Sequence, residues 1–417
     1  MIGVAALVVA ATVGMSYGAV GNGGHARASK TAAPGSHAKV PAKSTRSVTT
    51  GSWCGTPAVA VTNCLVALSF VNATVGFGIY SPLDAAGVSG PTELVSTTDG
   101  WSTWHEMGRL PAVGSDSGVG GQPTLTFVSA SDGVEYGARG VFVTHDGGHN
   151  WAPIAVPGRV DASTALGRRL WLTYTTCTVS PTTAPCTVGV EASSDAGRTW
   201  RVLDLPTEPF RAAQTAVGMG GTLVVAEWGD QEGYSANDPG VLLTSTDSDG
   251  SWLPSPLPCP TDFREGGQLS LAPSSRTIWL VCSGAGAVGT RPNVVYRSTD
   301  LGTSWVAESS YPPALDATAH LLPGAPTGTI YALVARSSTE AWVLEMRRGG
   351  LLATSDGGRS WHDALPATTS QRVGTQLRAL AVVTPTRAYV AAHAFSFTFH
   401  GGLWRTTDGG RTWKRVR

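Results

Sequence analysis

The chain has 417 residues, enough for one large domain or two medium ones, and only 14% of them are charged, well below the ~25% of an average globular protein. Lysine plus arginine and aspartate plus glutamate both number 29, so the formal charge is zero. This balance argues against nucleic acid or an anionic membrane surface as a partner, because binding to either relies on excess basic residues. The 52 glycines are typical of short strands joined by tight turns.

The N-terminal segment predicts export. Residues 2–20 are apolar and uncharged, and Ala26-Arg27-Ala28 matches an Ala-x-Ala cleavage site before Ser29. No lysine or arginine precedes the apolar core, so the usual basic region is missing. We predict a cleaved signal peptide over residues 1–28 and an extracellular or cell-envelope location. An uncleaved single membrane anchor is the alternative.

Residues 29–52 are rich in Ala, Ser, Thr, Lys and Pro and predict a flexible tether, which leaves residues 53–417 for the folded domain. The six cysteines of this domain agree with an oxidising compartment. Pairing of sequence neighbours gives three disulfides, although six cysteines permit fifteen pairings. The predicted pairs are Cys54 with Cys64, Cys177 with Cys186, and Cys259 with Cys282.

An internal repeat decides the architecture. The eight-residue pattern Ser/Thr-x-Asp-x-Gly-x-Ser/Thr-Trp occurs seven times, and we call this unit the repeated turn. Four copies are intact, and three carry one substitution each, at Trp101, Asn150 and Asp249. The aspartates of the seven copies are Asp99, Asp146, Asp195, Asp247, Asp300, Asp356 and Asp408.

Each copy predicts a hairpin turn between two short β runs. The Asp and Ser/Thr side chains can accept backbone N–H groups of the turn, glycine permits positive φ, and the Trp offers a large apolar surface. Two more β runs precede each copy, as at 125–128 and 134–136. Four strands per period of about fifty residues predict an all-β fold, a seven-bladed β-propeller of four-stranded antiparallel blades.

These repeats resemble the Asp-box (bacterial neuraminidase repeat) β-propellers of the sialidase-like superfamily. That group includes sialidases, sortilin-type receptor propellers, xyloglucan-cleaving hydrolases and photosystem II assembly and stability factors. The Asp-Gly-Gly copies at Asp146, Asp356 and Asp408 are most similar to the assembly-factor and hydrolase branches. The resemblance implies that every repeated turn joins the third and fourth strands, away from the ligand face. It also implies that all seven aspartates are structural.

Sequence signatures of catalysis and metal binding are missing. The Phe/Tyr-Arg-Ile-Pro segment that the resemblance would require of a sialidase does not occur. No Cys-x-x-Cys or His-Glu-x-x-His occurs, and the nine histidines are scattered. We therefore expect no metal and no cofactor.

Topology singles out one end of the ring for binding. Strands alternate in direction, so the loops between second and third strands share one end with the links between blades, opposite the repeated turns. We call these ends the loop end and the turn end. The loop end carries enlarged loops, and loops grown on a rigid ring commonly carry binding. They cover residues 176–188, 229–240, 283–293 and 395–401.

Polar and aromatic residues gather in these loops and the adjoining link. Three carboxylates there are candidate catalytic groups: Glu227, Asp230 and Asp262. Six further residues are candidates for ligand binding: Trp228, Tyr234, Arg264, Glu265, His393 and His400. The alternative is that these residues are solvated loop charges and aromatic side chains packed between blades.

The leading functional hypothesis is an exported, monomeric, non-catalytic propeller that binds a protein or carbohydrate partner at the cell envelope. A secreted glycoside hydrolase is the second hypothesis, and it requires two carboxyl groups roughly 5–9.5 Å apart. An assembly factor for a membrane complex is the third. The mode of ring closure stays open, since residues 53–66 offer an additional strand.

Overall fold

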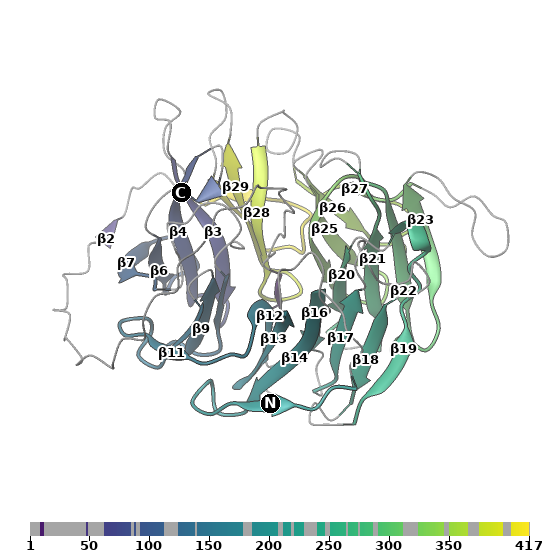
Figure 1. Ribbon diagram of the computed structural model, residues 1–417. Coiled ribbons are helices and arrows are strands. Elements are labelled where there is room, and N and C mark those ends of the chain that lie inside the picture. Colours follow the sequence, from purple (N-terminus) through teal and green to yellow (C-terminus); the bar gives the residue numbers. More distant parts are fainter. Residues whose placement is uncertain are drawn as a thin grey trace, which may run out of the picture.

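The protein is a seven-bladed β-propeller in which each blade is a four-stranded antiparallel sheet, as predicted (Figure 1). The computed structural model describes residues 9–11, 47–48, 62–84, 87–88, 92–111, 124–137, 140–177, 186–206, 212–217, 221–228, 240–246, 251–263, 266–273, 276–286, 291–311, 324–345, 350–365, 375–394 and 402–416. Among these, one short 3-10 helix, η1 (Thr261–Phe263), accompanies the strands. No described helix is long and apolar enough to cross a membrane.

The first four blades follow each other along the chain. Blade 1 holds β3 (Thr62–Phe70), β4 (Gly76–Asp84), β6 (Glu93–Thr97) and β7 (Trp104–Arg109). Blade 2 holds β8 (Thr124–Phe127), β9 (Gly133–Gly137), β10 (Gly140–Thr144) and β11 (Ala152–Ile154). Blade 3 holds β12 (Arg159–Leu166), β13 (Arg169–Cys177), β14 (Cys186–Ser193) and β15 (Arg201–Leu203). Blade 4 holds β16 (Ala212–Val217), β17 (Leu223–Trp228), β18 (Val241–Ser245) and β19 (Leu253–Pro256).

The last three blades repeat this order. Blade 5 holds β20 (Gly266–Leu271), β21 (Ile278–Ser283), β22 (Asn293–Ser298) and β23 (Val306–Tyr311). Blade 6 holds β24 (Ile330–Ala335), β25 (Ala341–Glu345), β26 (Leu351–Thr354) and β27 (His362–Asp363). Blade 7 holds β28 (Thr375–Val382), β29 (Ala388–Ala394), β30 (Gly402–Thr406) and β31 (Lys414–Arg415).

Three short strands add to this frame. β5 (Gly87–Val88) pairs with β4, β2 (Ser47–Val48) pairs with β7 at the outer edge of blade 1, and β1 (Val9–Ala11) pairs with β28. The rest of the predicted signal peptide and tether lies outside the described residues. Residues 62–66, which the sequence left as a free additional strand, belong to β3, the first strand of blade 1.

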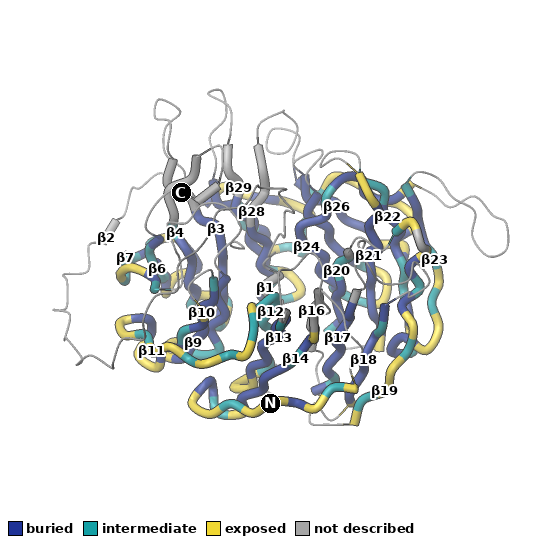
Figure 2. Tube along the Cα trace, viewed as in Figure 1, coloured by how far each residue is buried: buried dark blue, intermediate teal, exposed yellow. Residues whose placement is uncertain are grey.

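The strands are apolar on both faces because each blade is covered by a blade on either side. All six residues of β21 and of β24 are buried, and only the outer strands, such as β11 and β19, are mostly exposed (Figure 2). Side chains that alternate along β17 divide between two cores. Leu223 and Val225 pack with blade 3, whereas Val224 and Ala226 pack with blade 5.

The ring closes between blade 7 and blade 1 by side-chain packing, because each of these blades consists of its own four consecutive strands. β28 contacts β3, and the rings of Phe70 and Tyr389 stack with centroids 4.4 Å apart. The Arg387 guanidinium donates to the carbonyl of Ala73 over 2.7 Å, and the Tyr389 hydroxyl donates to the carbonyl of Gly100 over 3.2 Å. Aromatic stacking and hydrogen bonds thus join blade 7 to blade 1.

Every repeated turn joins the third and fourth strands of its blade. In the blade-5 copy, Asp300 accepts the Ser304 N–H over 2.9 Å and the hydroxyls of Ser298 and Ser304 over 2.7 and 2.6 Å. The Ser298 hydroxyl oxygen in turn accepts the Gly302 N–H. Equivalent bonds hold Asp99, Asp146, Asp195, Asp356 and Asp408. Asp247 lies outside the described residues.

The fourth and fifth residues of the turn both adopt positive φ, which explains the glycines. Trp101 takes the glycine position in blade 1 at φ 68° and is fully buried. The N–H of the fourth residue also donates to a carbonyl of the first hairpin of the same blade, at 2.8–3.1 Å. These bonds link Gly100 to Thr74, Gly147 to Ser131, Ala196 to Arg168, Leu301 to Arg276, Gly357 to Thr339 and Gly409 to Thr386.

Replacement of a turn aspartate is expected to destabilise the fold. Asp300→Ala removes three hydrogen bonds to a carboxylate and leaves the exposed Ser304 N–H to water, at a cost of roughly 1–3 kcal/mol. Thr299→Ala, at an exposed position of the same turn, is the matched control and should change stability by less than about 0.5 kcal/mol. Chemical denaturation measures both. Equal stability of the two variants would contradict a structural role for Asp300.

The turns also predict loss of stability in acid. Hydrogen bonds from the side chain and backbone of Ser304 lower the pKa of Asp300 to about 2, and those from Thr412 do the same for Asp408. A lowered folded-state pKa stabilises the protein above the unfolded value of 3.8, and this contribution disappears as the pH falls toward about 2. Thermal unfolding temperatures should therefore drop steeply between pH 4 and pH 2. A flat profile over this window would contradict the hydrogen-bonded turns.

Candidate functional site

The two ends of the ring use their polar side chains differently. At the turn end, the six described turn aspartates bind groups of their own turns. Arginines there cross between blades, as Arg198 binds Asp132 over 2.9 Å and Arg359 binds Glu308 over 3.4 Å. The described polar side chains of the turn end are thus used within the fold, which leaves the loop end as the candidate site.

Most of the candidate residues from the sequence lie outside the described residues: Asp230, Tyr234, Arg264, Glu265 and His400. Trp228 ends β17 and His393 lies in β29, but their side chains are not described. Asp262 is exposed in η1, on the link between blades 4 and 5. Glu227 is fully buried, so it does not line an open groove as the candidate catalytic role supposed.

Register shows why Glu227 is buried. Leu223 of β17 pairs with Ser245, the first residue of the repeated turn, and Glu227 lies four residues further toward the loop end. We call the packed interface between two neighbouring blades a seam, and the residue of each second strand that is equivalent to Glu227 the seam position. It is occupied by Tyr80, Gly137, Tyr174, Glu227, Cys282, Glu345 and Ala392. Since alternate residues share a face, the seam positions of blades 3–6 face the preceding blade.

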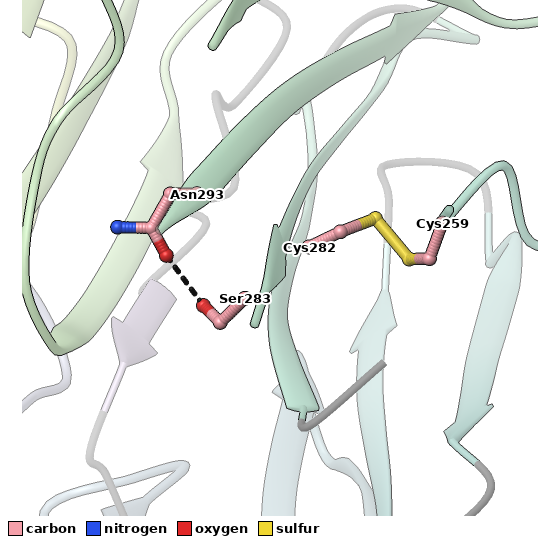
Figure 3. The surroundings of a disulfide bond; sticks show 4 residues. All are labelled: Cys259, Cys282, Ser283 and Asn293. Carbon is pink, nitrogen blue, oxygen red and sulfur yellow. Dashed lines mark hydrogen bonds between the residues drawn. A yellow bond between two sulfur atoms is a disulfide. The ribbon is translucent and has the colours of Figure 1, made fainter. Parts of the chain in front are cut away.

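In blade 5 the seam position is Cys282, which forms a disulfide. Cys282 binds Cys259, which lies on the link from blade 4 (Figure 3). Both cysteines are buried, and the link is also held by the Leu257 N–H, which donates to the Gly240 carbonyl. Of the other predicted pairs, Cys177 and Cys186 pair in register at the ends of β13 and β14. Their side chains, and those of Cys54 and Cys64, are not described.

Asn293, the first residue of β22, extends this region toward blade 6. Its amide is fully buried, and its oxygen accepts the Ser283 hydroxyl over 2.7 Å (Figure 3). Its NH₂ group donates to the carbonyls of Pro326 and Gly328 over 3.0 and 2.9 Å. Both carbonyls belong to the link between blades 5 and 6, so Asn293 fixes that link to β21 and β22.

In blade 6 the seam position is Glu345, and it binds the same link. The Thr327 N–H donates to Glu345 Oε2 over 3.0 Å, and the carboxyl group is buried. In blades 5 and 6 the seam position therefore anchors the link that enters its own blade, once by a disulfide and once by a hydrogen bond.

In blade 4 the described residues provide no such anchor for the same position. Neither carboxyl oxygen of Glu227 has a hydrogen-bond partner among the described residues, and both are inaccessible to solvent. Burial raises the pKa of Glu227 to about 8, and no neighbouring charge contributes to the shift. At neutral pH the side chain is therefore a buried, neutral carboxylic acid.

Sequence reasoning missed Asn293 and Glu345. A usable signal existed for the glutamates, since both Glu227 and Glu345 end runs of four apolar residues that lead into a loop. No such signal exists for Asn293, because its partners come from a link more than thirty residues away. Within the described residues, no group of three or more His, Cys, Asp or Glu side chains could hold a metal ion.

Comparison with known proteins places the fold. No protein-family model matches the chain, and no curated protein matches it. Among solved structures, an ulvan lyase (a polysaccharide lyase) is 13% identical with a TM-score of 0.50, covering 87% of this chain and 96% of that chain. YCF48 from Cyanidioschyzon merolae is 14% identical with a TM-score of 0.48, covering 88% and 99%. The similarity to the ulvan lyase shows a shared fold and no more.

Removal of the Cys259–Cys282 disulfide should destabilise the chain. The bond closes a loop with a sequence separation of 23, for which the loss is about 2–4 kcal/mol. The double variant Cys259→Ala and Cys282→Ala should unfold at lower denaturant concentration than the wild type. The midpoint of urea unfolding measures this. An unchanged midpoint would show that the link is held by its other contacts, chiefly Leu257 to Gly240.

Proposed function

We propose that the protein is an exported scaffold that binds a protein or glycan partner through the loop end of its propeller and performs no catalysis of its own. One observation carries this proposal: the described turn aspartates are all used by their own turns, whereas at the other end a disulfide and a buried amide anchor the links into blades 5 and 6, beside the loops that the sequence predicts for binding. A rigid ring with variable loops at one end is the usual arrangement of a binding propeller.

We further infer that the repeated turns are Asp boxes of the sialidase-like superfamily. Support comes from the recurring bonds of the aspartate to the residue two before it and the residue four after it, and from the position of each turn between third and fourth strands. Export is part of the same proposal, with residues 1–28 as the cleaved signal. The buried disulfide agrees with folding in an oxidising compartment.

A glycoside hydrolase is the second candidate, and Glu227 is the observation that favours it. A carboxyl group that stays protonated at neutral pH has the properties of a general acid. Its complete burial, however, separates it from solvent and from any substrate in the described state. A fluorogenic glycoside panel tests this candidate, with Glu227→Gln as the variant that should lose turnover.

Site-specific photo-cross-linking tests the proposed binding end. A benzoylphenylalanine in place of exposed Asp262 should cross-link a cell-envelope partner, because that residue lies on a link at the loop end. The matched control places the same group at exposed Thr299, at the turn end, and should capture nothing. Capture at position 299 alone would overturn the proposal. If the wild type turns over a glycoside and Glu227→Gln abolishes this turnover, the protein is a glycoside hydrolase and the binding proposal is wrong.

A further inference from the structure

The loop ends of blades 4, 5 and 6 differ in how the seam position is held. Cys282 is bonded covalently to the incoming link and Glu345 accepts an N–H from it, whereas Glu227 has no hydrogen-bond partner among the described residues. All three are buried at equivalent register. Of the three seams, only the one between blades 3 and 4 contains a neutral carboxylic acid, Glu227, without a hydrogen-bond partner among the described residues.

Among the described residues, the surface of blade 3 that faces Glu227 offers no cation for it. Thr173 and Thr175 share a face of β13 with Trp171, which packs with blade 4, and Val188 and Val190 of β14 belong to the same core. An ionised Glu227 would thus be placed in a largely apolar seam. Ionisation of a buried, unpaired carboxyl group is strongly unfavourable, so the closed seam requires the proton.

The charged groups near this seam are already paired or distant. On β12, Arg159 binds Asp161 over 2.9 Å, and the Thr175 hydroxyl donates to the same carboxylate. Arg169 and Arg201 lie on the same side of blade 3 but at its turn end, and β16 contains no titratable residue. Within the strands packed here, no charged group is placed to neutralise an ionised Glu227.

We propose that the loop end of the seam between blades 3 and 4 is a proton-controlled opening of the ring: it stays closed while Glu227 is a neutral acid and loosens when this carboxyl group loses its proton. Opening returns the carboxyl group to water, where its pKa is near 4.5. The open form therefore holds fewer protons than the closed form between pH 4.5 and about 8, and its population rises with pH across that window. The device does not depend on which partner binds the loop end.

Hydrogen–deuterium exchange of the full chain between pH 5.5 and 8.5 tests the proposal. Protection factors, which correct for intrinsic exchange, are compared between strands of the seam (β13, β14 and β17) and reference strands (β21 and β25). Protection in the seam strands should fall by about tenfold per pH unit up to about pH 8, while the reference strands change much less. Equal pH dependence in both sets of strands, or none in the seam strands, would overturn the proposal.

Two variants assign the effect to Glu227. Glu227→Gln has the same shape and no proton to lose, so the seam strands should keep their protection at every pH. Glu345→Gln is the matched control at the equivalent position and should leave the pH dependence of the blade 3–4 seam intact. A Glu227→Gln chain that still loses seam protection with rising pH contradicts the proposal. If this variant does not fold, carbon-13 NMR of the Glu227 carboxyl in the wild type decides: titration near or below pH 5 refutes the buried acid.

Discussion

The architecture depends on a hydrogen-bonded turn that forms the second hairpin of each blade and is also hydrogen-bonded to the first. Within each described repeat, the aspartate accepts a backbone N–H four residues on, and the Ser/Thr two residues before it accepts another. This geometry places two successive residues at positive φ. The N–H of the first of them donates to a carbonyl of the hairpin that joins the first and second strands of the same blade. One motif thus fixes a turn and also ties the inner pair of strands to the outer pair.

These blades are apolar on both faces, so each is stable only when a blade packs against either face. The contacts between neighbouring blades therefore hold the ring together. At the turn end the seams are joined by arginines, among them Arg336, which donates to the Gly409 carbonyl and lies 4.3 Å from the Trp342 ring centroid. At the loop end the contacts between blades 3 and 6 differ: a disulfide holds the link into blade 5, a buried amide and a bound carboxylate hold the link into blade 6, and Glu227 of blade 4 has no hydrogen-bond partner among the described residues. Blades 7 and 1 are joined by the stacked rings of Phe70 and Tyr389 and by hydrogen bonds to the carbonyls of Ala73 and Gly100.

Under the proposed function, this division separates the residues that hold the fold from those that bind, along the axis of the ring. Changes at the turn end disturb hydrogen bonds that every blade repeats, whereas the loops can change while their bases stay anchored. Blades 5 and 6 show such a base, in which Cys282, Asn293 and Glu345 fix the two links beside them. Blade 4 is the exception, and the proposed proton-dependent opening beside it would alter the shape of the loop end without unfolding the ring.

The sequence by itself determined the number of blades, their strand order and the role of the turn aspartates, because the repeated turn is local. Every group that Asp300 binds lies within four residues of it in the chain. The Cys259–Cys282 pair was also within reach of sequence reasoning, since nearness along the chain was enough to propose it. Only the tertiary structure decided the state of Glu227, which the sequence placed in a ligand groove and the fold buries in a seam. Its surroundings come from another blade, and burial by a neighbouring blade depends on register and packing between distant segments. For the same reason Asn293 carried no signal, because the carbonyls that it binds reach it only after blades 5 and 6 have packed together.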